Sequence, residues 1–294
     1  MLSVTGKVFL VTGVAGFIGY HCSKKLLSLG ATVIGLDSLN EYYDVNLKLA
    51  RLKLLKSTPH FKFYHQDLCD LEALKSLFET ESPQKVLNLA AQAGVRYSIE
   101  NPNTYMDSNI IGTYNVFEAC RINNVKRIIF ASSAHIMGYH DRKKKLDEKS
   151  SFRPDSHYAV SKCFGESLSK LYSDKYNIKI LNIRIGSALP KPTDMRFLST
   201  WISFRDLVHL VDVGLKSKKL YCSSVYGISK NKRAWWNNKE AYKLGYKPKD
   251  NAEKHAKDKL TKNESKDKIA LRLHGGVFTT DGLKGKLSNI LKNN

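Results

Sequence analysis

The chain has 294 residues, a formal net charge of +21 and five cysteines, a length that suits one large α/β domain or a nucleotide-binding domain with a smaller lobe. The cysteines are scattered without a C-x-x-C pair, which argues against a disulfide scaffold and favours a reducing, cytoplasmic location. No stretch approaches the roughly 18–20 apolar residues of a membrane span, so we expect a soluble protein. Lysines alternate with acidic residues over 249–268 without a nucleic-acid-binding signature, so we expect a solvated basic surface and no nucleic-acid partner.

Apolar runs typical of buried strands alternate with helical patterns along the first two thirds of the chain. The first run is followed by glycines and by a helical pattern that closes on Gly30 as a C-cap. The predicted strands cover residues 7–12, 31–37, 61–65, 85–91, 127–133 and 178–186. This alternation predicts an α/β fold with a Rossmann-type, doubly wound parallel sheet, which binds ligands at the carboxyl ends of its strands.

The alternation of strands and helices weakens after about residue 186. We therefore predict a nucleotide-binding Rossmann domain over residues 1–186 and a small, mixed substrate-binding region over residues 187–294. The second region is expected to contain a helix over 202–215 and a polar stretch near 250–268.

A glycine motif with G-x-x-G-x-x-G spacing follows the first predicted strand and opens the first helix. Gly13 permits a tight turn, Gly16 lets the backbone approach a pyrophosphate, and Gly19 allows close packing of helix on strand. The phosphates are expected at the helix N-terminus, where free N–H groups and the helix dipole favour negative charge. We predict that Phe17 and Ile18, between the last two glycines, also contact the dinucleotide.

Acidic residues follow the second and third predicted strands. Asp37 ends the second strand, where its carboxylate can accept hydrogen bonds from the adenosine ribose and would repel a 2′-phosphate, so NAD is favoured over NADP. A helix N-cap is the alternative role for Asp37. Asp67 and Leu68 are weaker candidates for contacts with the adenine, and a surface turn is nearly as consistent with their pattern.

A tyrosine and a lysine in a Y-x-x-x-K pattern form the candidate catalytic group. Tyr158 and Lys162 lie at i and i+4, on one face of a predicted helix, and Ser133 ends the strand 127–133 at the carboxyl edge of the sheet. A tyrosine that acts as a base near neutral pH needs about 4 kcal/mol of preferential phenolate stabilisation. Lys162 and a positive nicotinamide ring can supply much of it, and Tyr158 and Lys162 are also predicted to contact the cofactor, with Lys162 on the nicotinamide ribose. No metal site is predicted.

Together, TGVAGFIG (12–19), Ser133 and the Tyr158/Lys162 pair resemble the extended short-chain dehydrogenases, specifically the NAD-dependent epimerase/dehydratase group. Residues 1 to about 115, with DSLNEYYDVNLKLARLKLL and LAAQAGVRYSIENP, resemble nucleotide-sugar uronate 4-epimerases. Residues from about 110 onward, with SSAHIMGY, RPDSHYAVSKCFGE, MRFLSTW and HGGVF, resemble uronate dehydrogenases, which oxidise free hexuronic acids at C1 with NAD.

The resemblance implies a set of substrate-binding residues. Arg196 is implied to pair with the substrate carboxylate, and the others lie beside the sugar: Ser98, Ser133, His135 and Ser187. Uronate dehydrogenases carry an asparagine where this chain has Ala134, so one hydrogen bond to the substrate is expected to be absent. Related proteins commonly self-associate through helices next to the catalytic one, which implies a homo-oligomer.

Three functions remain open at this point. The second half of the fold selects the substrate, and only a short stretch, 187–201, separates the strand 178–186 from the next helix, which favours a monosaccharide acid and oxidation to an aldarolactone. The first alternative is 4-epimerisation or dehydration of a UDP-uronic acid with tightly held NAD. The second alternative is a non-catalytic family member that keeps NAD as a structural or sensing ligand.

Overall fold

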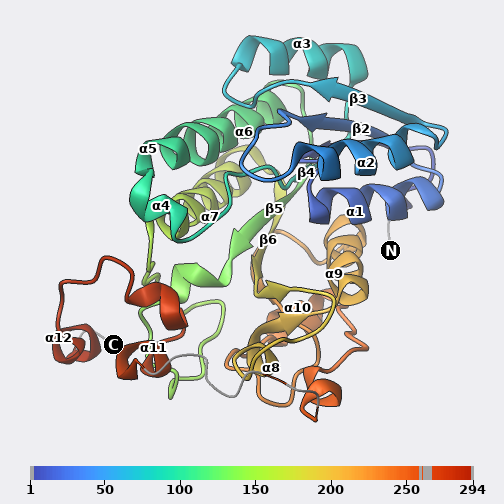
Figure 1. Cartoon of the computed structure of the whole chain (residues 1–294). Coiled ribbons are helices and arrows are strands. Elements are labelled where there is room, and N and C mark those ends of the chain that lie inside the picture. Colours follow the sequence, from blue (N-terminus) through green and yellow to red (C-terminus); the bar gives the residue numbers. More distant parts are fainter. Residues whose placement is uncertain (1–2, 258–259, 261–266, 293–294) are drawn as a thin grey trace.

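A computed structural model describes residues 3–257, 260 and 267–292, and its centre is a seven-stranded sheet of order β3-β2-β1-β4-β5-β6-β9 (Figure 1). All neighbouring strands pair in parallel. The strands are β1 Val8–Thr12, β2 Thr32–Asp37, β3 Phe61–His65, β4 Lys85–Asn88, β5 Arg127–Ser133, β6 Lys179–Ile185 and β9 Cys222–Gly227. The six predicted strands and the Rossmann-type sheet are confirmed, whereas β9 was not predicted.

Helices cover both faces of the sheet, because successive residues of a buried strand point to opposite faces. In β1, Phe9 and Val11 pack in one core cluster and Leu10 in the other. The first cluster is covered by α1 Phe17–Ser28, α2 Val45–Lys56, α9 Phe204–Lys216 and α10 Lys239–Leu244. The second is covered by α3 Leu71–Glu81, α6 Gly112–Ile122 and α7 His157–Tyr176 (Figure 1).

The C-terminal end of α9 is fixed to the sheet by two buried cations. Lys85, at the start of β4, donates from Nζ to the Leu215 carbonyl at 3.0 Å. Arg127, at the start of β5, donates from Nη1 to the carbonyls of Gly214 at 2.7 Å and Ser217 at 3.0 Å. Cations at this position satisfy the last carbonyls of the helix and complement its dipole.

Short elements surround the carboxyl ends of the strands. They are α4 Tyr97–Glu100, α5 Pro102–Tyr105, the π-helix η1 Met106–Ile111, η2 Ala134–Met137, β7 Ser187–Ala188, α8 Phe197–Thr200, β8 Trp201–Ile202, η3 Ala252–His255, α11 Lys268–Arg272, η4 Gly276–Thr279 and α12 Leu287–Lys292. Residues after 186 thus contribute to the sheet, through β9, as well as to its carboxyl edge. The division into residues 1–186 and 187–294 stays a prediction.

The helix predicted over 202–215 is confirmed as α9. Part of the polar stretch near 250–268, namely 258–259 and 261–266, lies outside the described residues. In the described part of the chain, no helix is both long enough and apolar enough to cross a membrane.

Candidate functional site

A cleft of about 870 Å³ opens where β1, β2, β3 and β4 end. Its lining includes every residue that was predicted to bind the cofactor outside the Tyr158/Lys162 pair: Gly13, Gly16, Phe17, Ile18, Gly19, Asp37, Asp67 and Leu68. The glycine motif and the acidic strand ends therefore face one space, at the edge of the sheet where the topology predicts a ligand.

The glycine turn is crowded in the way a phosphate-binding turn requires. Gly13 has a φ of +67°, and a Cβ there would lie 2.9 Å from the backbone nitrogen of Ala90. Gly16 donates to the Gly13 carbonyl at 3.0 Å, and a Cβ on Gly19 would overlap that same carbonyl oxygen. Helix α1 begins directly after Gly16, so its first N–H groups face the cleft beside Gly13.

Asp37 is held by backbone donors at the end of β2. Its Oδ2 accepts from the Ala15 N–H at 3.0 Å and its Oδ1 from the Leu39 N–H at 2.9 Å. It does not cap the following helix, because Asp44 is the N-cap of α2. The alternative role as an N-cap is therefore wrong, and the carboxylate lines the cleft.

The segment 38–51 covers the cleft from the side of β2. The Tyr42 ring lies 5.1 Å from the ring of Tyr97, which belongs to the other wall, so these two side chains bridge the opening. Arg51 reaches from α2 and donates to the Ala15 carbonyl at 3.2 Å. In the sequence this segment indicated only the family resemblance, and neither Tyr42 nor Arg51 was predicted to lie at the site.

Gln66 is a further cleft residue that was not predicted from the sequence. It lines the cleft just before Asp67, and within the described part of the chain its buried Oε1 has no hydrogen-bond partner. A buried amide oxygen without a partner is costly, so this atom is suited to accept from an amino group of a ligand. Only its position at the end of a predicted strand could have indicated it.

The three predicted catalytic residues lie together at the end of β5. Ser133 ends that strand, Tyr158 is in the first turn of α7, and Lys162 follows one turn later. Lys162 is 3 % exposed, and its Nζ lies 5.6 Å from the centre of the Tyr158 ring. The Tyr158 and Ser133 side chains lie next to each other, so that the serine influences the phenol. The predicted constellation is thus assembled by the fold.

Burial acts in opposite directions on the two titratable members of this group. It raises the pKa of Tyr158 above 10, while the adjacent Ser133 hydroxyl partly lowers it and the charge of Asp155 raises it further. It lowers the pKa of Lys162 from 10.5 to about 7. In the protein without cofactor, the phenol therefore keeps its proton at neutral pH and the amine is close to its titration midpoint.

This burial makes Lys162 a source of instability that depends on pH. Because the folded-state pKa is depressed, the unfolded chain binds more protons between about pH 7 and 10, and stability rises with pH across that window. We expect Lys162→Met to raise the melting temperature near pH 7, with a gain that shrinks towards pH 10. Thermal unfolding at several pH values measures this, with Lys170→Met, an exposed position of the same helix, as control. A variant less stable than the parent near pH 7 would contradict it.

Asn109 connects the cofactor cleft to the catalytic helix and was not predicted. It lies in the π-helix η1, accepts from the Gln92 N–H at 2.7 Å and donates to the Gln92 carbonyl at 3.1 Å and to Ser161 Oγ at 3.0 Å. Gln92 lines the cleft and Ser161 precedes Lys162. π-Helical turns are frequent at functional sites, and this one fixes the cleft wall against α7.

The implied substrate residues His135 and Arg196 are brought together by a C-terminal segment, 274–278. The His274 carbonyl accepts from Arg196 Nη2 at 3.0 Å, and a Cβ on Gly276 would lie 2.9 Å from Arg196 Nε. The Phe278 ring meets the His135 ring edge-on at 5.0 Å. Both residues therefore lie on the side of the strand ends that holds Ser133.

The two implied serines are placed differently. Ser187 is partly exposed in β7, with its Oγ 3.0 Å from Thr200 Oγ1. Ser98 is completely buried, and its hydroxyl donates to the Val95 carbonyl at 2.6 Å. The structure does not bring Ser98 to the cleft surface, and a contact with substrate would require this turn to rearrange.

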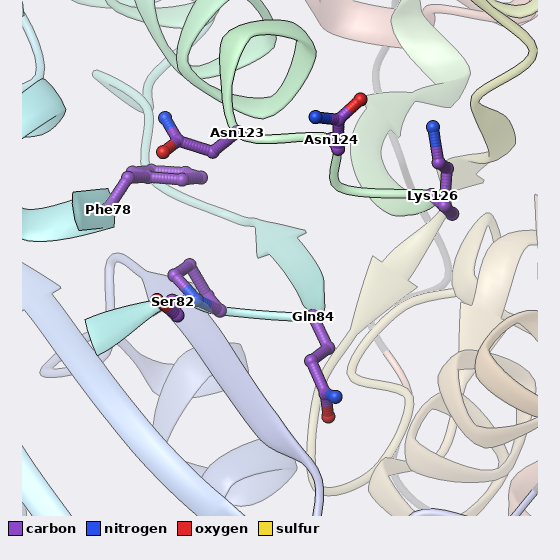
Figure 2. Close-up of a pocket in the computed structure, with 7 residues that line it drawn as sticks. Phe78, Ser82, Gln84, Asn123, Asn124 and Lys126 are labelled. Carbon is purple, nitrogen blue, oxygen red and sulfur yellow. The ribbon is translucent and has the colours of Figure 1, made fainter. Parts of the chain in front are cut away.

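A second hollow, of about 320 Å³, lies at the amino ends of β4 and β5 (Figure 2). Its lining includes Gln84, which directly precedes β4, and Lys126, which directly precedes β5. It contains none of the predicted site residues and faces the amino ends of the strands, whereas doubly wound sheets bind ligands at the carboxyl ends. The candidate site is therefore the cleft and the group around Tyr158.

Comparison with known proteins agrees with this geometry. A family model described as GDP-mannose 4,6 dehydratase matches residues 10–237. A uronate dehydrogenase of Pseudomonas putida is 34% identical over 274 residues, which cover 93% of this chain and 96% of that protein. A UDP-glucuronate 4-epimerase of Thermodesulfobacterium geofontis is 45% identical over 176 residues, 60% of this chain and 54% of that protein.

Solved structures include one of glucuronic acid dehydrogenase from Chromohalobacter salexigens, with a TM-score of 0.81 and 34% identity. That alignment covers 93% of this chain and 96% of the solved one. The family model spans most of the chain, and the dehydrogenase matches extend over nearly all of it. The chain therefore belongs to the NAD-dependent epimerase/dehydratase family.

Proposed function

We propose that this protein is an NAD-dependent uronate dehydrogenase, which oxidises a free hexuronic acid at C1 to an aldarolactone. The observation that carries the proposal is the segment 274–278, which places the cation of Arg196 on the same side of the strand ends as His135 and the Tyr158 group. A guanidinium can hold a carboxylate through two parallel hydrogen bonds and so fix a sugar acid in one orientation. The full-length relatedness to uronate dehydrogenases supports the same choice.

The stretch between β6 and α9 supports a small substrate. Strand β7 pairs with β8, which closes the intervening residues into a short loop, and Trp201 Nε1 donates to the Leu189 carbonyl at 2.8 Å across its base. Leu198 and Trp201 pack in a small core with Ala252. A loop this short favours a pocket for a monosaccharide over one for a nucleoside diphosphate.

The cleft fits a dinucleotide. Its volume, the bare glycine turn at the start of α1 and the buried acceptor of Gln66 suit a pyrophosphate with an attached adenine. Gly13 and Gly16 would face the phosphates, Asp37 the adenosine ribose and Gln66 the adenine amino group. Bound NAD supplies the acceptor for the hydride that leaves C1 of the sugar.

The residues of the chain move the proton. Tyr158, as phenolate, takes the proton of the anomeric hydroxyl, and Ser133 donates a hydrogen bond to the same oxygen. Charge on Lys162, beside the ring, stabilises the phenolate. Arg196 holds the carboxylate, and Lys162, which is 3 % exposed, is shielded from water beside the partly exposed Tyr158 ring.

A direct assay tests the proposal. Purified protein is mixed with NAD and either glucuronate or galacturonate, and NADH absorbance is followed. Absence of a signal with both sugars at high protein concentration would refute the dehydrogenase function. Conversion of UDP-glucuronate to its 4-epimer without net NADH would instead establish the epimerase alternative, which the similarity to the Thermodesulfobacterium geofontis epimerase favours.

Arg196 gives a more specific prediction. We expect Arg196→Met to raise KM for the sugar acid about 100-fold, because a charge-assisted pair contributes about 1.5–3 kcal/mol. Discrimination between the hexuronate and the uncharged hexose should fall by a similar factor. Steady-state kinetics with both sugars measures this, and Arg205→Met, which removes an exposed arginine paired with Asp250, is the matched control. An unchanged discrimination would exclude Arg196 as the carboxylate-binding residue.

We also propose that the partner is a small sugar acid rather than a nucleic acid, and that the protein is a homo-oligomer. Apolar side chains are exposed on α6 and α7, among them Tyr114 and Ile122 on the first and Val160 and Leu171 on the second. Such residues on neighbouring helices are suited to an interface between copies. Light scattering would give a multiple of the chain mass, and the monomer mass at micromolar concentration would oppose this.

A further inference from the structure

His135 and Asp155 form a close pair beside the catalytic group. The His135 Nδ1 and Asp155 Oδ2 atoms are 2.7 Å apart, and the aspartate side chain is completely buried. His135 follows the end of β5 and Asp155 shortly precedes the start of α7. The pair therefore joins the two elements that carry Ser133 and Tyr158.

The Asp155 carboxylate is fixed by close backbone packing. A side chain at Gly138 or at Gly275 would overlap it, and Gly275 donates to the Gly138 carbonyl at 2.8 Å. The second oxygen, Oδ1, accepts from Ser156 Oγ at 3.0 Å. Asp155 thus has one place for its carboxylate and one orientation towards His135.

This arrangement sets the proton on the imidazole. An ionised carboxylate only accepts, so Nδ1 of His135 must carry the hydrogen and Nε2 of the neutral ring is left as an acceptor. Within the described residues Nε2 has no hydrogen-bond partner, and the side chain keeps 17% of its surface exposed. Phe278 packs edge-on against the ring and prevents it from turning away.

We infer that Asp155 is a positioning residue, which holds His135 in the Nδ1–H tautomer so that Nε2 accepts a hydrogen bond from a hydroxyl of the sugar. The inference rests on the proposed function and extends it to specificity. A site with an acceptor at this point binds a hydroxyl and does not bind a carbonyl or an ether oxygen. The neighbouring Ala134 offers only a methyl group, so His135 supplies the polar contact on this side.

The tautomer can be measured without any variant. Two-dimensional ¹⁵N–¹H NMR of imidazole-labelled protein distinguishes Nδ1–H from Nε2–H histidines, and His135 is assigned by its loss in His135→Gln. The inference requires the Nδ1–H form near pH 8. The Nε2–H form would overturn it. Because this measurement needs no turnover, it stays informative if the wild type oxidises neither uronate and the proposed function fails.

Kinetics test whether Asp155 acts through His135. An amide at 155 can donate to Nδ1 and so favours the reverse tautomer, which would convert the acceptor into a donor. We expect Asp155→Asn to raise KM for the sugar acid about 10- to 100-fold, with kcat and NAD affinity within about three-fold of the parent. In the His135→Gln background, the same change should alter KM less than about two-fold, because coupled residues are not additive.

Two results separate positioning from a general structural role. Asp206→Asn removes another buried aspartate, which accepts from Ser229 and Lys249 and is not bonded to His135, and should lower the melting temperature while the effect on KM is the same in the parent and in the His135→Gln background. Equal effects of Asp155→Asn in both His135 backgrounds, or a fall in melting temperature without a change in KM, would overturn the inference.

Discussion

Replacing Tyr158 with phenylalanine is expected to lower kcat about 10²- to 10⁴-fold, the range that a positioned acid–base group contributes. The variant keeps the ring that packs against Tyr105 and loses only the hydroxyl that takes the proton of the anomeric oxygen. NAD affinity should change far less than kcat, because the residues that line the cleft and Lys162 all remain in place. NADH absorbance at saturating substrate gives kcat, and calorimetric titration gives the affinity.

The matched control for this prediction lies on the same helix. Tyr172 donates its phenol to Glu118 at the far side of the second core cluster, so Tyr172→Phe should leave kcat unchanged. If Tyr158→Phe retained more than about a tenth of the parent rate, another group would have to act as the base.

Gly13→Ala is expected to weaken NAD binding about 10- to 100-fold. Its φ of +67° costs an alanine about 1–2 kcal/mol, and the new Cβ would also lie 2.9 Å from the Ala90 backbone on the cleft wall. The two effects can be separated with Gly6→Ala, because Gly6 has a φ of +69° and a Cβ added there would have nothing within 4 Å. Titration with NAD and thermal unfolding of both variants measure affinity and strain.

A loss of NAD affinity in Gly13→Ala that Gly6→Ala does not share is the result that supports the assignment. Gly6→Ala should lower the melting temperature without changing NAD affinity, whereas Gly13→Ala should lower both. If both variants bound NAD as the parent does, the glycine turn would not be the phosphate site.

Features encoded locally could be predicted from the sequence. The strands follow from short apolar runs, the turn from glycine spacing, and the facing of Tyr158 and Lys162 from the helical repeat, since each depends on residues close together in the chain. Strand β9 was missed because its first residues, Cys222 to Ser224, are a cysteine and two serines and lack the β-branched, apolar pattern of a buried strand, although they pair with β6.

Contacts between distant segments could not be predicted. The pairing of His135 with Asp155 depends on how β5 and α7 meet. The hydrogen bond from Arg196 to the His274 carbonyl joins residues 78 positions apart. The resemblance pointed to His135 and Arg196 but gave no reason for their orientation. For Ser98 the resemblance implied a contact with the substrate, but the structure buries this residue and its hydroxyl donates to the Val95 carbonyl.

The contacts of Lys85 and Arg127 with the end of α9 affect when the sheet can become stable during synthesis of the chain. The Lys85–Leu215 bond spans 130 positions, so Lys85 has no α9 carbonyl to donate to until the 130 residues that follow it have been made. Without α9 the Lys85 ammonium stays in water, and so do the apolar side chains that pack against Leu210 and Val213. We therefore expect a fragment that ended after β6 to be less stable than the whole chain, because the apolar area that α9 buries would remain exposed.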